Sequence, residues 1–299
     1  MSCRSSPILR WVAAAALACA LPLAPAAQAA SLGSSGYTQN FNSLGASGTV
    51  LPEGWSAYSI SGSHTDWTTT IPASAIGGGT AASISAANAL LDSALKTTSK
   101  AATPFNLAHA ATPADRVLGT SPTGNAGMVL QLSLTNDSGA ALSALSLSYD
   151  IVKFSDGTKQ SSIDGTLITG EELPGYELFY SVDGGSSWSN VSALNPVSTA
   201  DGLHPVVATG TSSASGANPA LDYSVTSISG YTLNLASPLA AGGSLSLRWV
   251  DDNAVNVSPD QIIGLDNLAI TAAVPEPASL ALLSAGLALI GLRLRNRRR

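Results

Sequence analysis

The chain has no cysteine beyond residue 29, because its two cysteines, Cys3 and Cys19, both lie close to the N-terminus. If that N-terminal segment is removed, the remaining protein cannot form a disulfide, so packing or bound ions must hold it together. Histidine is also scarce, with only three in the chain, which limits the general bases available to an enzyme.

The N-terminal segment has the three parts of a secretory signal. Arg4 and Arg10 form a basic start, residues 11–23 form an apolar run, and Ala27-Gln28-Ala29 forms an A-x-A cleavage site. We therefore predict that residues 1–29 are a signal peptide, recognised by the Sec translocon and signal peptidase. The protein would then be exported, with a main domain at residues 30–273.

Basic residues are also few in the predicted domain. Residues 31–274 contain six lysines and arginines against eighteen aspartates and glutamates, a net charge of −12. An acidic surface repels phosphate backbones, so we expect no nucleic-acid partner. About 240 residues are enough for one large domain with its own core.

The C-terminal segment, residues 274–299, combines an apolar run with a basic end. Residues 278–292 are rich in leucine, alanine and glycine. As a helix rising ~1.5 Å per residue, this run is slightly shorter than the ~30 Å hydrocarbon core, and arginines can reach the head groups to compensate. We predict a single membrane span with the main domain outside the cytoplasm, since basic residues stay on the cytoplasmic side. These are Arg293, Arg295, Arg297, Arg298 and Arg299.

A short motif precedes the apolar run. It consists of Val274, Pro275, Glu276 and Pro277, and the two prolines keep it extended and outside the following helix. Together with the short apolar helix and the arginine-rich end, this motif resembles the PEP-CTERM sorting signal. The resemblance implies recognition by an exosortase, a membrane cysteine transpeptidase, near Pro275-Glu276-Pro277. The membrane anchor would then be transient, before delivery to the cell surface or extracellular matrix.

Period-two alternation of apolar and polar residues runs through the domain and predicts strands. Examples are residues 130–135, 145–151, 176–182, 231–235 and 245–249, separated by turns such as Asp183-Gly184-Gly185. One apolar and one polar face per strand predicts an all-β fold, an antiparallel β-sandwich of jelly-roll type. Residues 81–100 instead place apolar side chains near helical spacing, and we predict a short helix or an irregular insertion there.

A second resemblance extends over most of the domain. Its landmarks are Phe41-Asn42-Ser43-Leu44, Leu51-Pro52-Glu53-Gly54-Trp55, Asp115-Arg116-Val117-Leu118-Gly119 and Leu265-Asp266-Asn267-Leu268. The chain resembles exported jelly-roll domains that carry this tail and are distantly similar to carbohydrate-binding modules. That resemblance implies a structural calcium ion held by a side chain of the first strand and an aspartate of the last strand, for which Asn40 or Asn42, with Asn42 preferred, and Asp266 are the candidate ligands. Capping or turn hydrogen bonds by these residues are the alternative, and we expect no other cofactor.

We find no catalytic motif, although a triad assembled from distant residues stays open. The chain has no G-x-S-x-G elbow, and the adjacent acid pairs Glu171-Glu172 and Asp251-Asp252 do not form a catalytic pair in a strand. Residues 181–188 match the Asp-box pattern S-x-D-x-G-x-x-W, which we interpret as a structural hairpin.

Exposed aromatic side chains can stack against sugar rings. Among the tryptophans we expect Trp55 and Trp249 in the core, and Trp67 is the candidate platform for a glycan. The favoured function is therefore a noncatalytic surface or exopolysaccharide-matrix protein that binds glycans. The alternative is a secreted polysaccharide hydrolase on the same fold.

Overall fold

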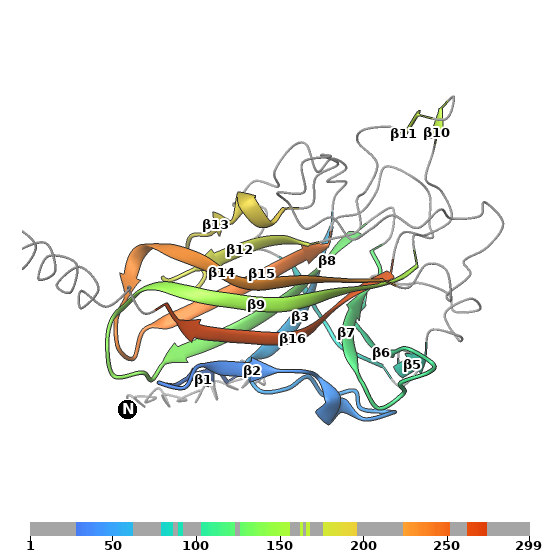
Figure 1. Cartoon of the computed structure of the whole chain (residues 1–299), viewed down its shortest axis with the longest axis horizontal. Coiled ribbons are helices and arrows are strands. Elements are labelled where there is room, and N and C mark those ends of the chain that lie inside the picture. Colours follow the sequence, from blue (N-terminus) through green and yellow to red (C-terminus); the bar gives the residue numbers. More distant parts are fainter. Residues whose placement is uncertain are drawn as a thin grey trace, which may run out of the picture.

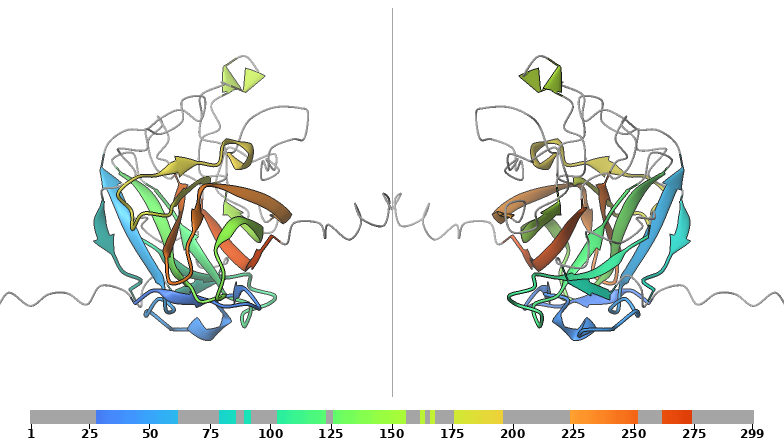
Figure 2. Two further views of the ribbon diagram at one scale, coloured as in Figure 1. Left: turned by 90° about the vertical axis from the view of Figure 1, so that its left-hand side faces the viewer. Right: turned by 90° about the vertical axis from the view of Figure 1, so that its right-hand side faces the viewer.

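Two face-to-face β-sheets form the domain, as seen along the strands in Figure 2. The computed structural model describes the following residues: 28–61, 79–85, 89–91, 103–122, 126–155, 162–163, 166–167, 176–195, 224–251 and 262–273. The predicted signal peptide up to residue 27 and the predicted sorting tail, residues 274–299, lie outside these ranges. Among the described residues, no helix is long and apolar enough to cross a membrane.

The first sheet has seven strands. In spatial order it contains β13 (Ser189–Asn190), β12 (Glu177–Ser181), β15 (Ser244–Asp251), β8 (Ala126–Asn136), β3 (Trp55–Ser61) and β4 (Thr80–Ala82), and β1 (Ala30–Leu32) pairs in parallel with β8 (Figure 1).

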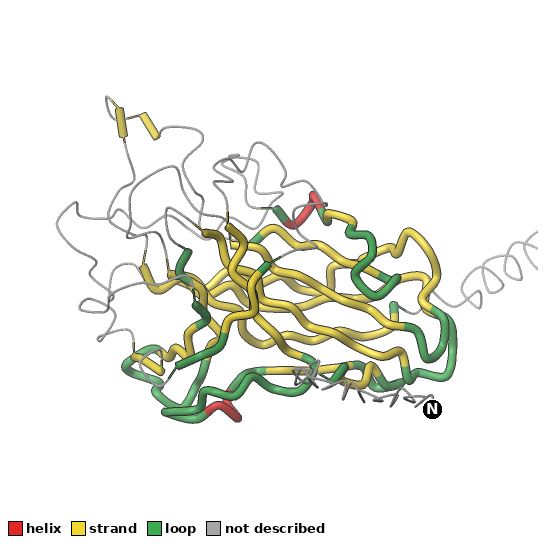
Figure 3. The backbone as a smooth tube through the Cα atoms, turned by 180° about the vertical axis from the view of Figure 1, so that it is seen from behind, coloured by secondary structure: helices red, strands yellow, loops and turns green. Residues whose placement is uncertain are grey.

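The second sheet also has seven strands. In spatial order it contains β14 (Ser224–Leu239), β9 (Leu142–Ser155), β16 (Ile262–Ala272), β7 (Val117–Thr120), β6 (Phe105–Ala108) and β5 (Ala89–Leu91), and β2 (Tyr37–Gln39) pairs with β16. A separate ribbon joins β10 (Ser162–Ile163) to β11 (Thr166–Leu167). Two 3-10 turns, Asn42–Leu44 and Ser192–Leu194, are the helical elements of the described chain and are red in Figure 3.

Alternation in the sequence places one face of each strand in the core. In β8, Leu130, Leu132 and Leu134 are fully buried, whereas Gln131 and Ser133 are partly exposed. Along the chain β8, β9, β12, β14, β15 and β16 lie alternately in the first and second sheet. The predicted antiparallel β-sandwich is confirmed, and its assignment to the jelly-roll type stays a prediction.

Aromatic rings fill the centre between the sheets. Trp55 and Trp249 stack with ring centroids 5.7 Å apart, and the rings of Phe41 and Tyr149 meet them edge-on. The indole Nε1 of Trp55 donates a hydrogen bond to the Tyr37 hydroxyl at 2.7 Å. Both tryptophans are therefore core residues, as the sequence predicts, and neither is available to stack on a ligand.

Of the two alternatives predicted for residues 81–100, a short helix or an irregular insertion, the helix is wrong where the structure describes the chain. Residues 80–82 form β4, which pairs with β3, and residues 89–91 form β5, which pairs with β6. Backbone hydrogen bonding to a neighbouring strand outweighs the modest helix preference of alanine, which amounts to less than ~1 kcal/mol per residue. Residues 92–100 lie outside the described ranges.

Candidate functional site: a polar groove between β2 and β16

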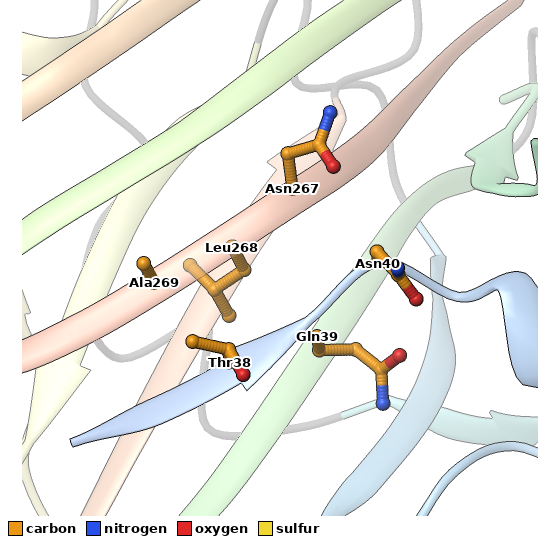
Figure 4. Close-up of a pocket in the computed structure, with 6 residues that line it drawn as sticks. All are labelled: Thr38, Gln39, Asn40, Asn267, Leu268 and Ala269. Atoms are coloured by element: carbon orange, nitrogen blue, oxygen red, sulfur yellow. The ribbon is translucent and has the colours of Figure 1, made fainter. Parts of the chain in front are cut away.

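A shallow groove of about 290 Å³ lies where β2 pairs with β16. Figure 4 shows side chains from both strands around it. Hydroxyl and amide side chains dominate the lining, with a smaller apolar part. The lining residues are Thr38, Gln39, Asn40, Asn267, Leu268 and Ala269.

A β-bulge shapes this groove. The pairing of β16 with β9 shifts between Asp266 and Ala269, and Asn267 adopts a left-handed conformation with φ of 49°. Asparagine tolerates this region better than most residues. Its Nδ2 donates a hydrogen bond to Asp150 Oδ2 of β9 at 2.9 Å, which holds this exposed side chain on the β9 side of β16. Bulges re-aim side chains in this way next to functional sites.

On the other strand, the polar side chains are partly occupied by their own backbone. Gln39 Oε1 accepts the N–H of Phe41 at 2.7 Å, and Asn40 Oδ1 accepts the N–H of Asn42 at 3.2 Å. Within the described chain, the Nδ2 of Asn40 and the Oδ1 of Asn267 have no partner. One donor and one acceptor from opposite strands are therefore left for a ligand.

Asp266 lies directly below this bulge and is only 2% exposed. Its Oδ1 accepts the backbone N–H of Asn267 at 2.7 Å. Burial, with a smaller contribution from the negative charges of Asp115 and Asp150, raises the pKa of Asp266 to about 7 despite the lowering by the Asn267 hydrogen bond. This carboxyl therefore resists ionisation, in contrast to an ordinary surface aspartate.

The structure places Asn42 differently from the sequence prediction. It begins the 3-10 turn Asn42–Leu44 and does not lie in a strand, because β2 ends at Gln39. Its Oδ1 accepts the backbone N–H of Arg116 at 2.6 Å. The described chain contains no group of three or more histidine, cysteine, aspartate or glutamate side chains arranged to hold a metal. The observed contacts of Asn42 and Asp266 match the hydrogen-bonding alternative, and calcium stays a prediction.

Asn106 and Arg116 form a buried polar clamp behind this turn. Arg116 donates from Nε to Asn106 Oδ1 at 2.7 Å and from its guanidinium to the Asn106 carbonyl at 2.6 Å. Asn106 Nδ2 in turn donates to the carbonyls of Gly45 and Gly48, each at 3.0 Å. The clamp fastens the loop after β2 onto β6 and β7, so the landmark motifs around residues 41–44 and 115–119 meet in space.

The Asp-box segment forms a hairpin turn, as the sequence predicts. Asp183 accepts hydrogen bonds from the backbone and hydroxyl of Ser187 and from the hydroxyl of Ser181. These bonds lower the pKa of Asp183 to about 2. Trp188 is buried, and the guanidinium of Arg248 lies 4.6 Å from its ring centroid and 4.8 Å from that of Tyr58. The Asp-box therefore has a structural role in this domain, through its turn hydrogen bonds and the packing of Trp188 against Arg248.

A second buried polar group was not foreseen from the sequence. The hydroxyl of Thr120 donates to Asp251 Oδ2 and lies 2.9 Å from the Tyr176 hydroxyl. All three residues are fully buried. Burial, together with the nearby charge of Asp251, raises the pKa of Tyr176 well above its ordinary value. The sequence shows Asp251 only as one of two adjacent acids and does not predict its burial, because that burial depends on strands distant along the chain.

Several predicted site residues lie outside the described ranges. These are the glycan platform Trp67, the motif residues Val274, Pro275, Glu276 and Pro277, and the terminal basic cluster Arg293, Arg295, Arg297, Arg298 and Arg299. The tail is nevertheless tested by comparison with known families, because residues 273–299 match the PEP-CTERM protein-sorting motif. The chain carries a PEP-CTERM sorting signal. This signal points to an exported, surface-associated protein that is processed by an exosortase.

Comparison with whole proteins adds little to the PEP-CTERM assignment. No curated protein matches the chain. Among solved structures, the Stig cyclase FisC from Fischerella sp. TAU, in complex with (3Z)-3-(1-methyl-2-pyrrolidinylidene)-3H-indole, aligns over 76% of this chain and 90% of its own. The sequence identity is 14% and the TM-score is 0.30, too low to support a conclusion about this protein.

Proposed function

We propose that the sandwich is a noncatalytic glycan-binding module of the cell surface or exopolysaccharide matrix, sorted there by its PEP-CTERM signal. The polar groove between β2 and β16 is the observation that supports this proposal. Glycans present closely spaced hydroxyl groups that both donate and accept hydrogen bonds. The Asn40 amide and the Asn267 carbonyl offer one partner of each kind, one from each side of the groove, and the half-buried Ala269 offers a small apolar contact for the carbon face of a sugar.

The test is binding of the full chain to a glycan array, followed by measurement of reducing ends. We expect retention on the array without release of reducing ends. The Asn40→Ala variant should bind about tenfold more weakly, as should Asn267→Gly, which removes the amide but tolerates positive φ. The exposed Asn234 on β14 supplies the control, and Asn234→Ala should bind normally. Release of reducing ends would instead support the polysaccharide hydrolase, and unchanged binding by both groove variants would place the glycan elsewhere.

We also propose that a structural calcium ion stabilises the domain through Asp266. The supporting observation is the negative charge gathered around this buried carboxyl, because Asp115 and Asp150 both raise its pKa and a divalent cation would offset their repulsion.

Calcium should raise the melting temperature of the protein by about 5 °C, since a ligand that binds only the folded state stabilises it. A chelator should reverse this increase. The Asp266→Asn variant should no longer respond, whereas Asp137→Asn, which changes an exposed acid in the turn after β8, should respond like the natural chain. Equal responses of Asp266→Asn and the natural chain to calcium, followed by differential scanning fluorimetry, would contradict the proposal.

A further inference from the structure

The last core strand ends next to the sorting motif. Ala272 is the final paired residue of β16, opposite Leu145, and the N–H of Ala273 still donates to the Ala144 carbonyl at 3.1 Å. Only Ala273 and Val274 then separate Ala272 from Pro275. A chain spans at most ~3.6 Å per residue, so the connection from Ala272 to Pro275 is at most about 11 Å long.

Three turns surround the point where the tail leaves the sandwich. They comprise residues 33–36, 137–141 and 240–243, and together with Ala273 we call them the turn end. Backbone bonds connect them: the Asp137 N–H donates to the Leu32 carbonyl, and Asn136 exchanges bonds with Gly242 and Gly243. The first strand of the domain, β1, also ends here, because its last residue, Leu32, pairs with Asn136.

A buried asparagine keeps the turn end rigid. Asn136 is 1% exposed, and its Nδ2 donates to the carbonyls of Ala140, Leu239 and Ala240 at 2.8–3.1 Å. Its Oδ1 accepts from the backbone and hydroxyl of Ser138. Two of the three turns therefore hold their shape through one side chain.

The turn end is small and almost uncharged. Every residue in it is glycine, alanine or serine apart from Asp137, although the domain as a whole carries a net charge of −12. The opposite ends of the strands are marked by Ser61, Ser155 and Asp251, at the far end of the same ladders. The tail therefore emerges at an end of the sandwich whose described turns present little bulk and little charge.

We propose that the turn end is the surface on which the membrane-embedded processing enzyme docks when it acts on the sorting motif. The short connection carries the inference, because an active site that engages Pro275-Glu276-Pro277 must come within about 11 Å of the folded sandwich. An enzyme held in the membrane cannot approach so closely without contact with the turn end. This proposal rests on sorting and is independent of glycan binding.

The experiment follows processing of the full chain in cells that contain an exosortase, by pulse labelling and intact-protein mass spectrometry. The double variant Ala140→Glu with Ala241→Glu puts bulk and charge on two exposed positions of the turn end. Burying unpaired charge at an interface is unfavourable, so processing should slow at least about fivefold. The matched control, Ser227→Glu with Ser229→Glu on exposed positions of β14, should be processed at the natural rate.

A spacer distinguishes docking from a folding defect. Ten glycine and serine residues inserted between Ala273 and Val274 add a mean reach of about 17 Å, so the motif no longer has to be met beside the sandwich. The spacer should restore the double glutamate variant to within about twofold of the natural rate. Natural-rate processing of that variant without a spacer, or failure of the spacer to restore it, would overturn the proposal.

Two further measurements distinguish docking on the enzyme from failure of the sorting motif and from contact with the lipid surface. Replacing Pro275, Glu276 and Pro277 by alanine should block processing, and if it does not, sorting by this motif is itself wrong. If the motif is needed but the glutamate pair has no effect, only the docking surface is refuted. The double glutamate variant should also be processed more slowly by purified exosortase in detergent. If it is processed at the natural rate in detergent, the turn end contacts the lipid surface and not the enzyme, and the docking proposal is overturned.

Discussion

Replacing Asn106 by leucine should lower the free energy of unfolding by about 3–5 kcal/mol, because it leaves buried polar groups without partners. Asn106 is fully buried, and its side chain accepts from Arg116 and donates to the carbonyls of Gly45 and Gly48. Leucine has a similar volume but offers none of these hydrogen bonds. Arg116 is itself only 1% exposed, and its Nε would lose its acceptor, the side-chain Oδ1 of Asn106.

Urea denaturation followed by tryptophan fluorescence measures this change. The control is Asn234→Leu, the same substitution at an exposed position of β14, which should change stability by no more than about 0.5 kcal/mol. A loss below about 1 kcal/mol for Asn106→Leu would show that the clamp contributes little. In the Asn106→Leu variant, the amide hydrogens of the loop after β2 should exchange faster than in the natural chain.

In the presence of a chelator, stability should fall as the pH rises from about 4 to about 7. The pKa of Asp266 is raised to about 7 in the fold, whereas an aspartate in the unfolded chain ionises near pH 4. Between these values the folded state holds the proton more tightly, so it is favoured at low pH and loses this advantage as pH rises. The full difference corresponds to at most about 4 kcal/mol.

The Asp266→Asn variant should lose this slope, because asparagine can still accept the Asn267 N–H but does not titrate in this range. Glu53→Gln, which changes an exposed acid ahead of β3, should keep it. Denaturant midpoints measured at half-unit steps of pH report the slope directly. Parallel slopes for the natural chain and Asp266→Asn would show that another group causes the pH dependence.

The general architecture could be predicted from the sequence because one face of each strand packs into the apolar core and the other faces water. Alternation at residues 130–135 and 145–151 placed the core side chains correctly, and the turn residues at 183–185 marked a real hairpin. The Asp-box was also interpreted correctly, since its hydrogen bonds are local and involve residues only two to four positions apart. Local chemistry of this kind is written directly in the sequence.

The missed features all depend on contacts between distant residues. The alanine-rich stretch around residues 81–91 suggested a helix, but β3 and β6 provide edges that capture short strands from it. Asn42 was assigned to a strand and to calcium, whereas Arg116, 74 residues away, uses its oxygen. The groove itself required the register of β2 against β16 and the bulge at Asn267, neither of which has a sequence signature strong enough to predict.

The place of β16 in its sheet sets an order of events during synthesis. This strand lies between β9 on one side and β7 and β2 on the other, so the second sheet has a gap until residues 262–272 arrive. Those residues are the last strand of the described domain, and the sorting signal at residues 273–299 follows directly. The second sheet can therefore be completed only once the segment that leads straight into the sorting signal is available. Folding of the domain and presentation of the sorting signal therefore both depend on the same event, the availability of β16.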